Sequence, residues 1–87
     1  MSFRAILSSE AAKTLLRADI KLRARLQNRI HALTADPFDA RLSAPLTARA
    51  GMRKSRVGDW RILFSVDRSE HILNVAAIDT RGQVYRR

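Results

Sequence analysis

Residues 52–66 constrain the fold of this chain more than any other stretch: they read Met-Arg-Lys-Ser-Arg-Val-Gly-Asp-Trp-Arg-Ile-Leu-Phe-Ser-Val. A Gly-Asp pair at positions 58 and 59 divides them into two runs of strand length. Such a pair favours a tight turn, because glycine accepts a positive φ and aspartate can bond its own backbone. The stretch therefore predicts a β-hairpin.

The second run of this hairpin predicts which face of the sheet is buried. Side chains alternate across a strand, so the apolar residues Trp60, Ile62, Phe64 and Val66 share one face. We expect that face to pack in the core. Arg61 points to the opposite face and carries a cation that must reach water or a ligand.

The first run distributes its cations by the same alternation. Lys54 and Arg56 share one face, while Arg53 and Ser55 point the other way. If the two strands pair across the turn, Lys54, Arg56 and Arg61 gather on the open face of the sheet. This cluster is the candidate site.

The remaining chain predicts two helices and further strands. Ser8 or Ser9 can cap a helix that ends near Arg17, and Asp19 can cap a second helix that runs to about Thr34. The other expected elements are a strand at 3–7, a loop at 36–48, a turn at 67–70, a strand at 71–78 and a last short strand at 81–86. This order predicts one α+β domain over residues 1–87, with two helices on one face of a small, mainly antiparallel sheet.

The composition excludes several kinds of chemistry. The chain has 87 residues and no cysteine, so it has neither a thiol nucleophile nor a thiolate metal site. His31 and His71 lack metal-ligand spacing, and the three glycines are isolated turn residues that do not form a phosphate loop. We therefore expect no metal and no cofactor. We find neither a membrane-spanning run nor a signal peptide, and we expect a cytoplasmic protein.

The charge points to an anionic partner. The formal net charge is +9, and arginine supplies 14 of the 17 basic residues. Nucleic acid, an acidic protein or a membrane surface would each fit this charge. Arginine favours phosphate, because its planar guanidinium presents a fork of donors. The alternative is a basic surface that is merely solvated.

The candidate catalytic set contains five side chains: Lys54, Arg56, Arg61, Arg81 and Tyr85. Preorganised arginines can stabilise the negative charge that builds up when a phosphodiester is cleaved. RNA carries its own nucleophile, the 2′-OH, so a metal is not required. Lys54 is the only lysine in the second half and is the acid–base candidate, while Tyr85 could stack on a base or transfer a proton. The residues alone leave RNA binding and RNA cleavage equally open.

The second half of the chain resembles the RelE/ParE toxin superfamily of bacterial toxin–antitoxin systems. The resemblance rests on the Val-Gly-Asp-Trp-Arg turn at 57–61, on Val-Ala-Ala-Ile at 75–78, and on Arg-Gly-Gln-Val-Tyr-Arg at 81–86. A basic strand precedes the turn and an apolar strand follows it, as in the family. The first half of the chain agrees with the family in pattern only.

The resemblance implies a RelE-like fold and a ribosome-dependent mRNA endonuclease that needs no metal. By position, Lys54 and Arg56 match the family's basic strand pair and Arg61 its phosphate-stabilising arginine. Arg81 and Tyr85 match its C-terminal arginine and tyrosine. Further contacts to RNA are expected from four more arginines: Arg49, Arg53, Arg86 and Arg87.

The resemblance also implies partners, and it leaves alternatives. The expected partners are mRNA on the ribosome and a cognate antitoxin that covers the basic face, for example in a heterotetramer. Asp79-Thr80 stand where many members carry Gly-His, and an acidic group there could pair with Arg81 and weaken phosphate binding. The alternatives are a ParE-like inhibitor of DNA gyrase that cleaves no RNA, and a catalytically inactive basic module that binds nucleic acid.

Overall fold

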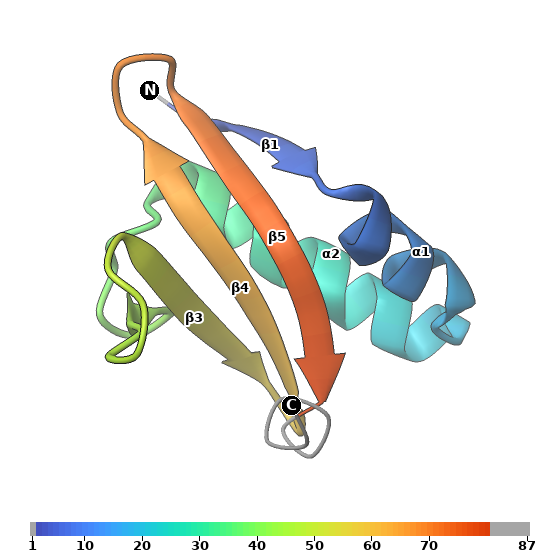
Figure 1. Cartoon of the computed structure of the whole chain (residues 1–87). Helices are drawn as coiled ribbons and strands as arrows, with labels where there is room; N and C mark the ends of the chain where they lie inside the picture. Colours follow the sequence, from blue (N-terminus) through green and yellow to red (C-terminus); the bar gives the residue numbers. More distant parts are fainter. Residues whose placement is uncertain (1, 81–87) are drawn as a thin grey trace.

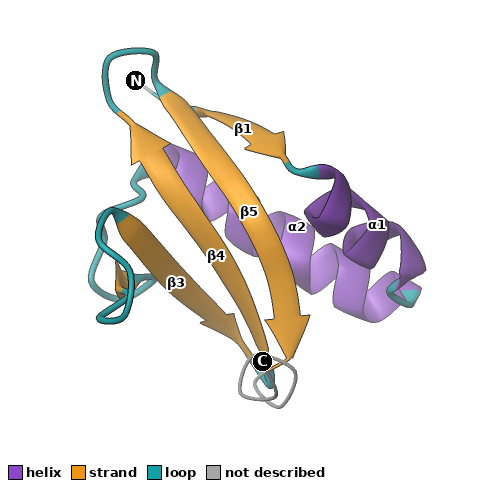
Figure 2. Cartoon of the chain, in the orientation of Figure 1, coloured by secondary structure: helices purple, strands orange, loops and turns teal. Residues whose placement is uncertain are grey.

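The computed structural model describes residues 2–80 as a five-stranded sheet with two helices on one face (Figure 1). In chain order the elements are β1 (Arg4–Leu7), α1 (Ser9–Arg17), α2 (Ile20–Ala35), β2 (Ala44–Pro45), β3 (Met52–Val57), β4 (Trp60–Asp67) and β5 (Ile72–Thr80). The strands lie in the order β1-β5-β4-β3-β2, and only the β1–β5 pair is parallel. The expected α+β architecture is confirmed. In Figure 2, α2 passes behind β4 and β5 and α1 lies beside β5, and no described helix lies in front of the sheet.

The two helices begin where the sequence predicts, because side-chain oxygens cap them. Ser8 Oγ accepts a hydrogen bond from the Ala11 amide at 3.0 Å and donates to the Ala76 carbonyl at 2.6 Å, which ties the start of α1 to β5. Asp19 Oδ1 accepts from the Leu22 amide at 2.8 Å at the start of α2. Caps of this kind satisfy backbone donors that the helix itself leaves unpaired.

The core lies between α2 and the helix-covered face of the sheet. Ile62 and Phe64 are fully buried, and Trp60 and Val66 pack against the same cluster, so the predicted core face of β4 is confirmed. The apolar side chains that are at most 1% exposed come from both helices, β4 and β5: Ala11, Leu26, Leu33, Ile62, Phe64, Leu73, Val75 and Ile78.

A β-bulge adjusts β5 to this core. Leu63 pairs with Ala77, but the next residue, Phe64, pairs with Val75, so Ala76 is an extra residue in β5. Val75 and Ile78 are three positions apart and would face opposite sides of a regular strand. The extra residue lets both side chains reach the core.

The structure differs from the sequence prediction at two places. The expected loop at 36–48 contains the short edge strand β2, whose Ala44 and Pro45 pair with Lys54 and Arg53 of β3. An edge position tolerates proline, because the missing amide faces away from the ladder. His71, expected to begin a strand, has φ +55° and belongs to the preceding turn. The strand expected at 81–86 lies outside the described residues.

Within residues 2–80, neither helix has the length and apolar character needed to cross a bilayer.

Candidate nucleic-acid interface

The pairing of β3 with β4 brings three of the candidate cations to one face of the sheet. Arg56 lies directly opposite Arg61, and Lys54 lies directly opposite Leu63. Directly opposed residues in an antiparallel pair point to the same side. Lys54, Arg56 and Arg61 therefore share the face that the helices leave uncovered.

These three cations differ in their contact with solvent. Arg56 on β3 is exposed and Lys54 is half-buried, whereas Arg61 is only 7% exposed. Arg61 lies on the central strand β4, between Arg56 of β3 and Asp79 of β5 at the same level of the sheet. From the sequence, we expect the Arg61 cation to reach water or a ligand. In the structure, Arg61 is nearly buried on this face of the sheet, and Arg56 and Asp79 lie on either side of it.

Asp79 lies beside Arg61 in the sheet. Its expected partner, Arg81, lies two positions further along the chain and outside the described residues. The β4–β5 register makes Asp79 the direct cross-strand partner of Arg61. A carboxylate at this position contributes negative charge beside the candidate phosphate-binding arginine.

The other predicted site residues do not join this cluster within the described part of the chain. Arg53 faces the helix side, where its Nε and Nη2 donate to Ser43 Oγ at 3.1 and 3.0 Å and its guanidinium stacks 5.0 Å from the Phe38 ring centre. Arg49 is exposed in the turn before β3. Four predicted residues lie outside the described residues: Arg81, Tyr85, Arg86 and Arg87.

Three further arginines, not predicted from the sequence, lie near the same cations. Arg25 and Arg29 of α2 and Arg41 of the following loop line two hollows that also contact Arg56. Arg25 and Arg29 are four residues apart, so they occupy one side of α2. That spacing was visible in the sequence, but it did not indicate that this side of α2 faces the edge of β3.

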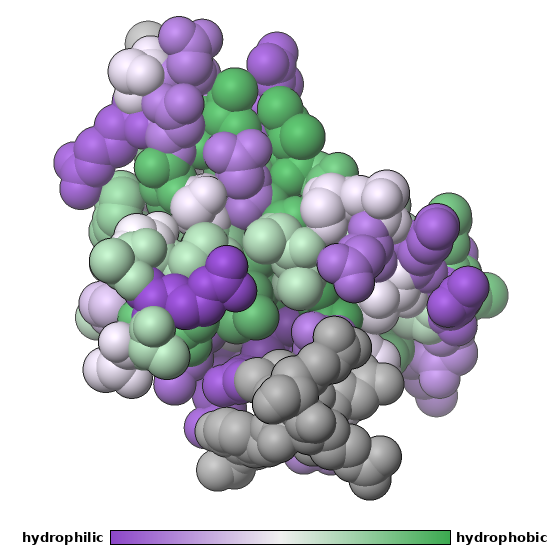
Figure 3. All heavy atoms as spheres, viewed as in Figure 1, coloured by the Kyte–Doolittle hydropathy of each residue, from purple (hydrophilic) through white to green (hydrophobic). Residues whose placement is uncertain are grey.

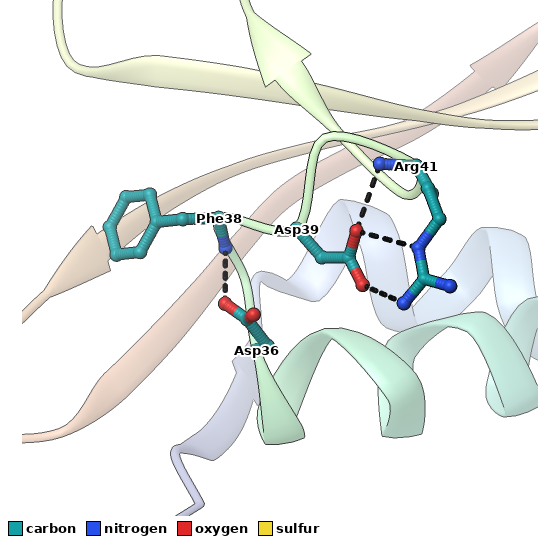
Figure 4. Close-up of polar contacts among 4 residues, drawn as sticks. All are labelled: Asp36, Phe38, Asp39 and Arg41. Atoms are coloured by element: carbon teal, nitrogen blue, oxygen red, sulfur yellow. Dashed lines mark hydrogen bonds and ion pairs between the residues drawn. The ribbon is translucent and has the colours of Figure 1, made fainter.

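Arg41 is held by an acidic neighbour. Figure 4 shows that Asp39 accepts hydrogen bonds from the backbone and the side chain of Arg41, with an ion-pair distance of 2.9 Å from Nη2 to Oδ2. These hydrogen bonds hold the pKa of Asp39 below its ordinary value and raise the pKa of Arg41. Asp36 in turn accepts from the Phe38 amide at 3.1 Å, which shapes the start of the same loop.

The uncovered face of the sheet has a hydrophobic part and a hydrophilic part. In Figure 3, hydrophobic residues gather over its upper part, and hydrophilic residues lie over β3 and around the margin. Among residues 2–80 no group of three His, Cys, Asp or Glu side chains could hold a metal ion. Lys54, Arg56 and Arg61 on this face can bind an anion and stabilise charge that develops on it.

Comparison with solved structures defines the fold class. The RelBE2 toxin–antitoxin complex of Mycobacterium tuberculosis contains a chain that matches with a TM-score of 0.79 and 20% identity, over 93% of this chain and 100% of that one. The intact RelBE complex of Escherichia coli matches with a TM-score of 0.79 and 12% identity, over 91% and 96% of the two chains. A YoeB/ParE toxin from Agrobacterium tumefaciens matches with a TM-score of 0.78 and 19% identity, over 91% and 99%. The fold is thus that of the RelE-like toxins.

The family follows from the sequence. Residues 5–85 match the model of the ParE toxin of type II toxin–antitoxin systems, and the chain belongs to this family within the RelE/ParE superfamily. No curated protein sequence matches the chain.

Proposed function

We propose that this toxin is a metal-independent endoribonuclease that cleaves mRNA on the ribosome. The observation that carries the proposal is the register of β3 and β4, which lines up Lys54, Arg56 and Arg61 on one sheet face. Cleavage of a phosphodiester concentrates negative charge on the non-bridging oxygens, and cations held by a rigid sheet can stabilise it without reorganising.

In the proposed reaction the RNA 2′-oxygen attacks the adjacent phosphorus. A bond forms between O2′ and phosphorus while the bond from phosphorus to O5′ breaks, which leaves a 2′,3′-cyclic phosphate and a free 5′-hydroxyl. The 2′-OH gives its proton to a base and the leaving O5′ receives one, so no water is consumed. Lys54 is assigned to this proton exchange, and Arg56 and Arg61 to the phosphate oxygens. Arg81 and Tyr85 are assigned to the same site by family resemblance.

A cognate antitoxin is the second proposed partner. The Mycobacterium tuberculosis and Escherichia coli neighbours are toxins crystallised with their antitoxins. The net charge of +9 favours a partner that presents acidic side chains to the basic face. An antitoxin bound over Lys54, Arg56 and Arg61 would exclude RNA from the same cations.

Primer extension on mRNA from cells that express the toxin tests the nuclease. We expect new 5′ ends inside codons with the parent chain. Arg56→Ala and Arg61→Ala should each reduce cleavage by about 10²- to 10³-fold, the effect of removing one donor that stabilises developing negative charge. Arg17→Ala, an exposed arginine on α1, is the matched control and should cleave like the parent. Arg56 is exposed, so its variant keeps the core intact even if removal of the nearly buried Arg61 perturbs folding.

Two outcomes would overturn this assignment. If Arg56→Ala and Arg61→Ala both cleave as well as Arg17→Ala, the assigned site is wrong. If the parent leaves transcripts intact while it stops growth, the nuclease proposal fails as a whole.

The second candidate function is poisoning of DNA gyrase without RNA cleavage. Two observations favour it: the family model that matches is that of ParE toxins, and Asp79 lies directly opposite Arg61, where its carboxylate competes with a phosphate. This candidate predicts intact transcripts together with trapped DNA breaks and an SOS response in expressing cells. The absence of both responses would rule it out.

A further inference from the structure

A groove runs along the outer edge of β3, beside the candidate catalytic cations. One part is a hollow of about 230 Å³ lined by Arg29 of α2, by residues 40–44, and by Lys54 and Arg56. The other part is a hollow of about 350 Å³ that shares Arg29 and Arg56 with the first. We call the two hollows together the β3-edge groove. Lys54 and Arg56 line its first part, so the groove includes the site proposed for cleavage.

The second part of the β3-edge groove extends from the sheet to α2. Besides the two shared arginines it is lined by Arg25, Asn28, Val57 and Gly58. The groove exists because β2 is so short: it pairs only with residues 53 and 54, and it leaves the rest of the β3 edge without a partner strand. Side chains from α2 fill the space beside that edge.

Arg29 is fixed in the groove before any ligand arrives. Its Nη1 donates to Ser55 Oγ at 2.9 Å and to the Arg56 carbonyl at 2.7 Å. Ser55 is 1% exposed, and its Oγ donates to the Leu42 carbonyl at 2.7 Å. These bonds connect α2, β3 and the loop at one point. A cation held in this way loses little side-chain entropy when it binds an anion.

Arg25 and Arg41 form the two ends of the groove. The Arg25 Nη2 atom lies 3.0 Å from the point where Gly58 would carry a Cβ, so this guanidinium rests on the turn between β3 and β4. Arg41 is held at the opposite end by Asp39. Both arginines are exposed, so each can reach a ligand that lies over the groove.

The charge along the groove has one sign. In the described part of the chain five cationic side chains and no carboxylate line the two hollows: Arg25, Arg29, Arg41, Lys54 and Arg56. Asp39 pairs with Arg41 beside them. Among residues 2–80 no aromatic side chain lines the groove, whereas the tightest contacts of protein interfaces are enriched in aromatic anchors. A row of cations that extends to both sides of a phosphodiester-cleaving site fits a continuous strand of phosphates.

We infer that the β3-edge groove binds the phosphates of the RNA strand that flanks the scissile bond. The inference rests on the proposed function for the identity of the ligand. Arg25, Arg29 and Arg41 then hold the flanking strand and position the scissile phosphate at Lys54, Arg56 and Arg61. These contacts are to the backbone, so they read no base sequence.

The salt dependence of RNA binding tests this inference. The probe is a fluorescent single-stranded RNA of about 12 nucleotides in which every 2′-OH is methylated, so that it cannot be cleaved. Anisotropy gives the affinity between roughly 50 and 200 mM NaCl, and each phosphate contact on a single strand contributes about 0.7 to the slope of log K against log salt. Arg25→Gln combined with Arg41→Gln should lower the slope by about 1.4, so the parent loses about sevenfold more affinity over this range.

The matched control removes two cations elsewhere. Lys13→Gln combined with Arg17→Gln changes the net charge equally on exposed positions of α1, away from the groove, and should keep the parent slope. Equal slopes for the groove and control variants would overturn the inference, as would a parent chain that does not bind the RNA at about 50 mM salt. A fluorescent polyglutamate peptide is the second probe. If the groove variant loses the peptide but keeps the RNA slope, the groove serves an acidic protein segment and the inference fails.

The test separates this inference from the proposed function. The methylated RNA reports binding only. A reduced slope in the groove variant, together with intact transcripts in expressing cells, would uphold the groove and remove the nuclease. New 5′ ends in transcripts, together with an unchanged slope in the groove variant, would uphold the nuclease and remove the groove.

Discussion

Gly58 forms the turn between β3 and β4 and also leaves space for Arg25 in the β3-edge groove. Its φ is +61°, and the following Asp59 has no positive φ, which is the pattern of a turn with glycine at its first central position. The absence of a side chain also leaves room for the Arg25 guanidinium. Gly51 has φ +80°, but nothing lies within 4 Å of the point where it would carry a Cβ.

The two glycines allow strain and contact to be separated. Gly51→Ala and Gly58→Ala should each lower the free energy of unfolding by about 1–2 kcal/mol, because an alanine at positive φ is strained. Only Gly58→Ala should also lower the RNA-binding slope, since its methyl group displaces Arg25. Denaturant unfolding and RNA anisotropy measure the two effects. The same RNA slope for both variants would show that Arg25 is not held by this turn.

At the scale of elements, the polar side of α2 does more than face solvent. Arg23 donates from Nε and Nη2 to the carbonyls of Leu15, Leu16 and Ala18, at 3.1, 2.9 and 3.0 Å, and so closes the end of α1. Arg29 binds the edge of β3. The helical spacing of these arginines was readable from the sequence. Their partners are carbonyls and a hydroxyl on other elements, and only packing brings those within reach.

The ion pair in the loop between α2 and β2 should make the free energy of unfolding decrease at acidic pH. The Arg41 side chain lowers the pKa of Asp39 below its reference of 3.8 in the folded chain. A lowered folded-state pKa stabilises the fold above the unfolded value, and this stability is lost as the pH falls through the folded value. The parent should therefore exceed Asp39→Asn in stability at about pH 6, and this difference should shrink below about pH 4.

Denaturant unfolding at several pH values measures that difference. The control repeats the comparison with Arg41→Gln in both chains, because loss of the arginine removes the main cause of the lowered pKa. We expect a smaller difference there, with less dependence on pH. A parent-minus-variant difference that grows on acidification would contradict the assigned ion pair.

At the scale of the whole molecule, the net charge of +9 on 87 residues is the main electrostatic feature. Like charges within one small protein repel one another and oppose the compact state. On the uncovered face, Lys54 and Arg56 of β3 lie beside Arg61 of β4. An acidic partner on this face would relieve that repulsion, which gives the proposed antitoxin an effect on stability as well as on activity.

Saturating antitoxin should therefore raise the melting temperature of the toxin. A partner that binds only the folded chain adds about 2.7 kcal/mol at one hundred times its dissociation constant. Calorimetry with and without the acidic segment of the cognate antitoxin measures this shift. A polyglutamate peptide of the same charge as the antitoxin segment is the control, because it can neutralise the basic face without binding it specifically. Equal melting temperatures in the presence and absence of the antitoxin segment would remove this partner.

The sequence by itself determined the fold class and the two faces of the hairpin. Alternation in 60–66 separated the core face from the face of Arg61, and Ser8 and Asp19 marked the helix starts, because strand periodicity and capping are local properties. The tertiary structure decided which side chains from different elements lie next to one another. The strand register set Asp79 against Arg61, and the packing of α2 carried Arg25 and Arg29 to the edge of β3. Those juxtapositions depend on residues far apart in the chain, so no local pattern encodes them.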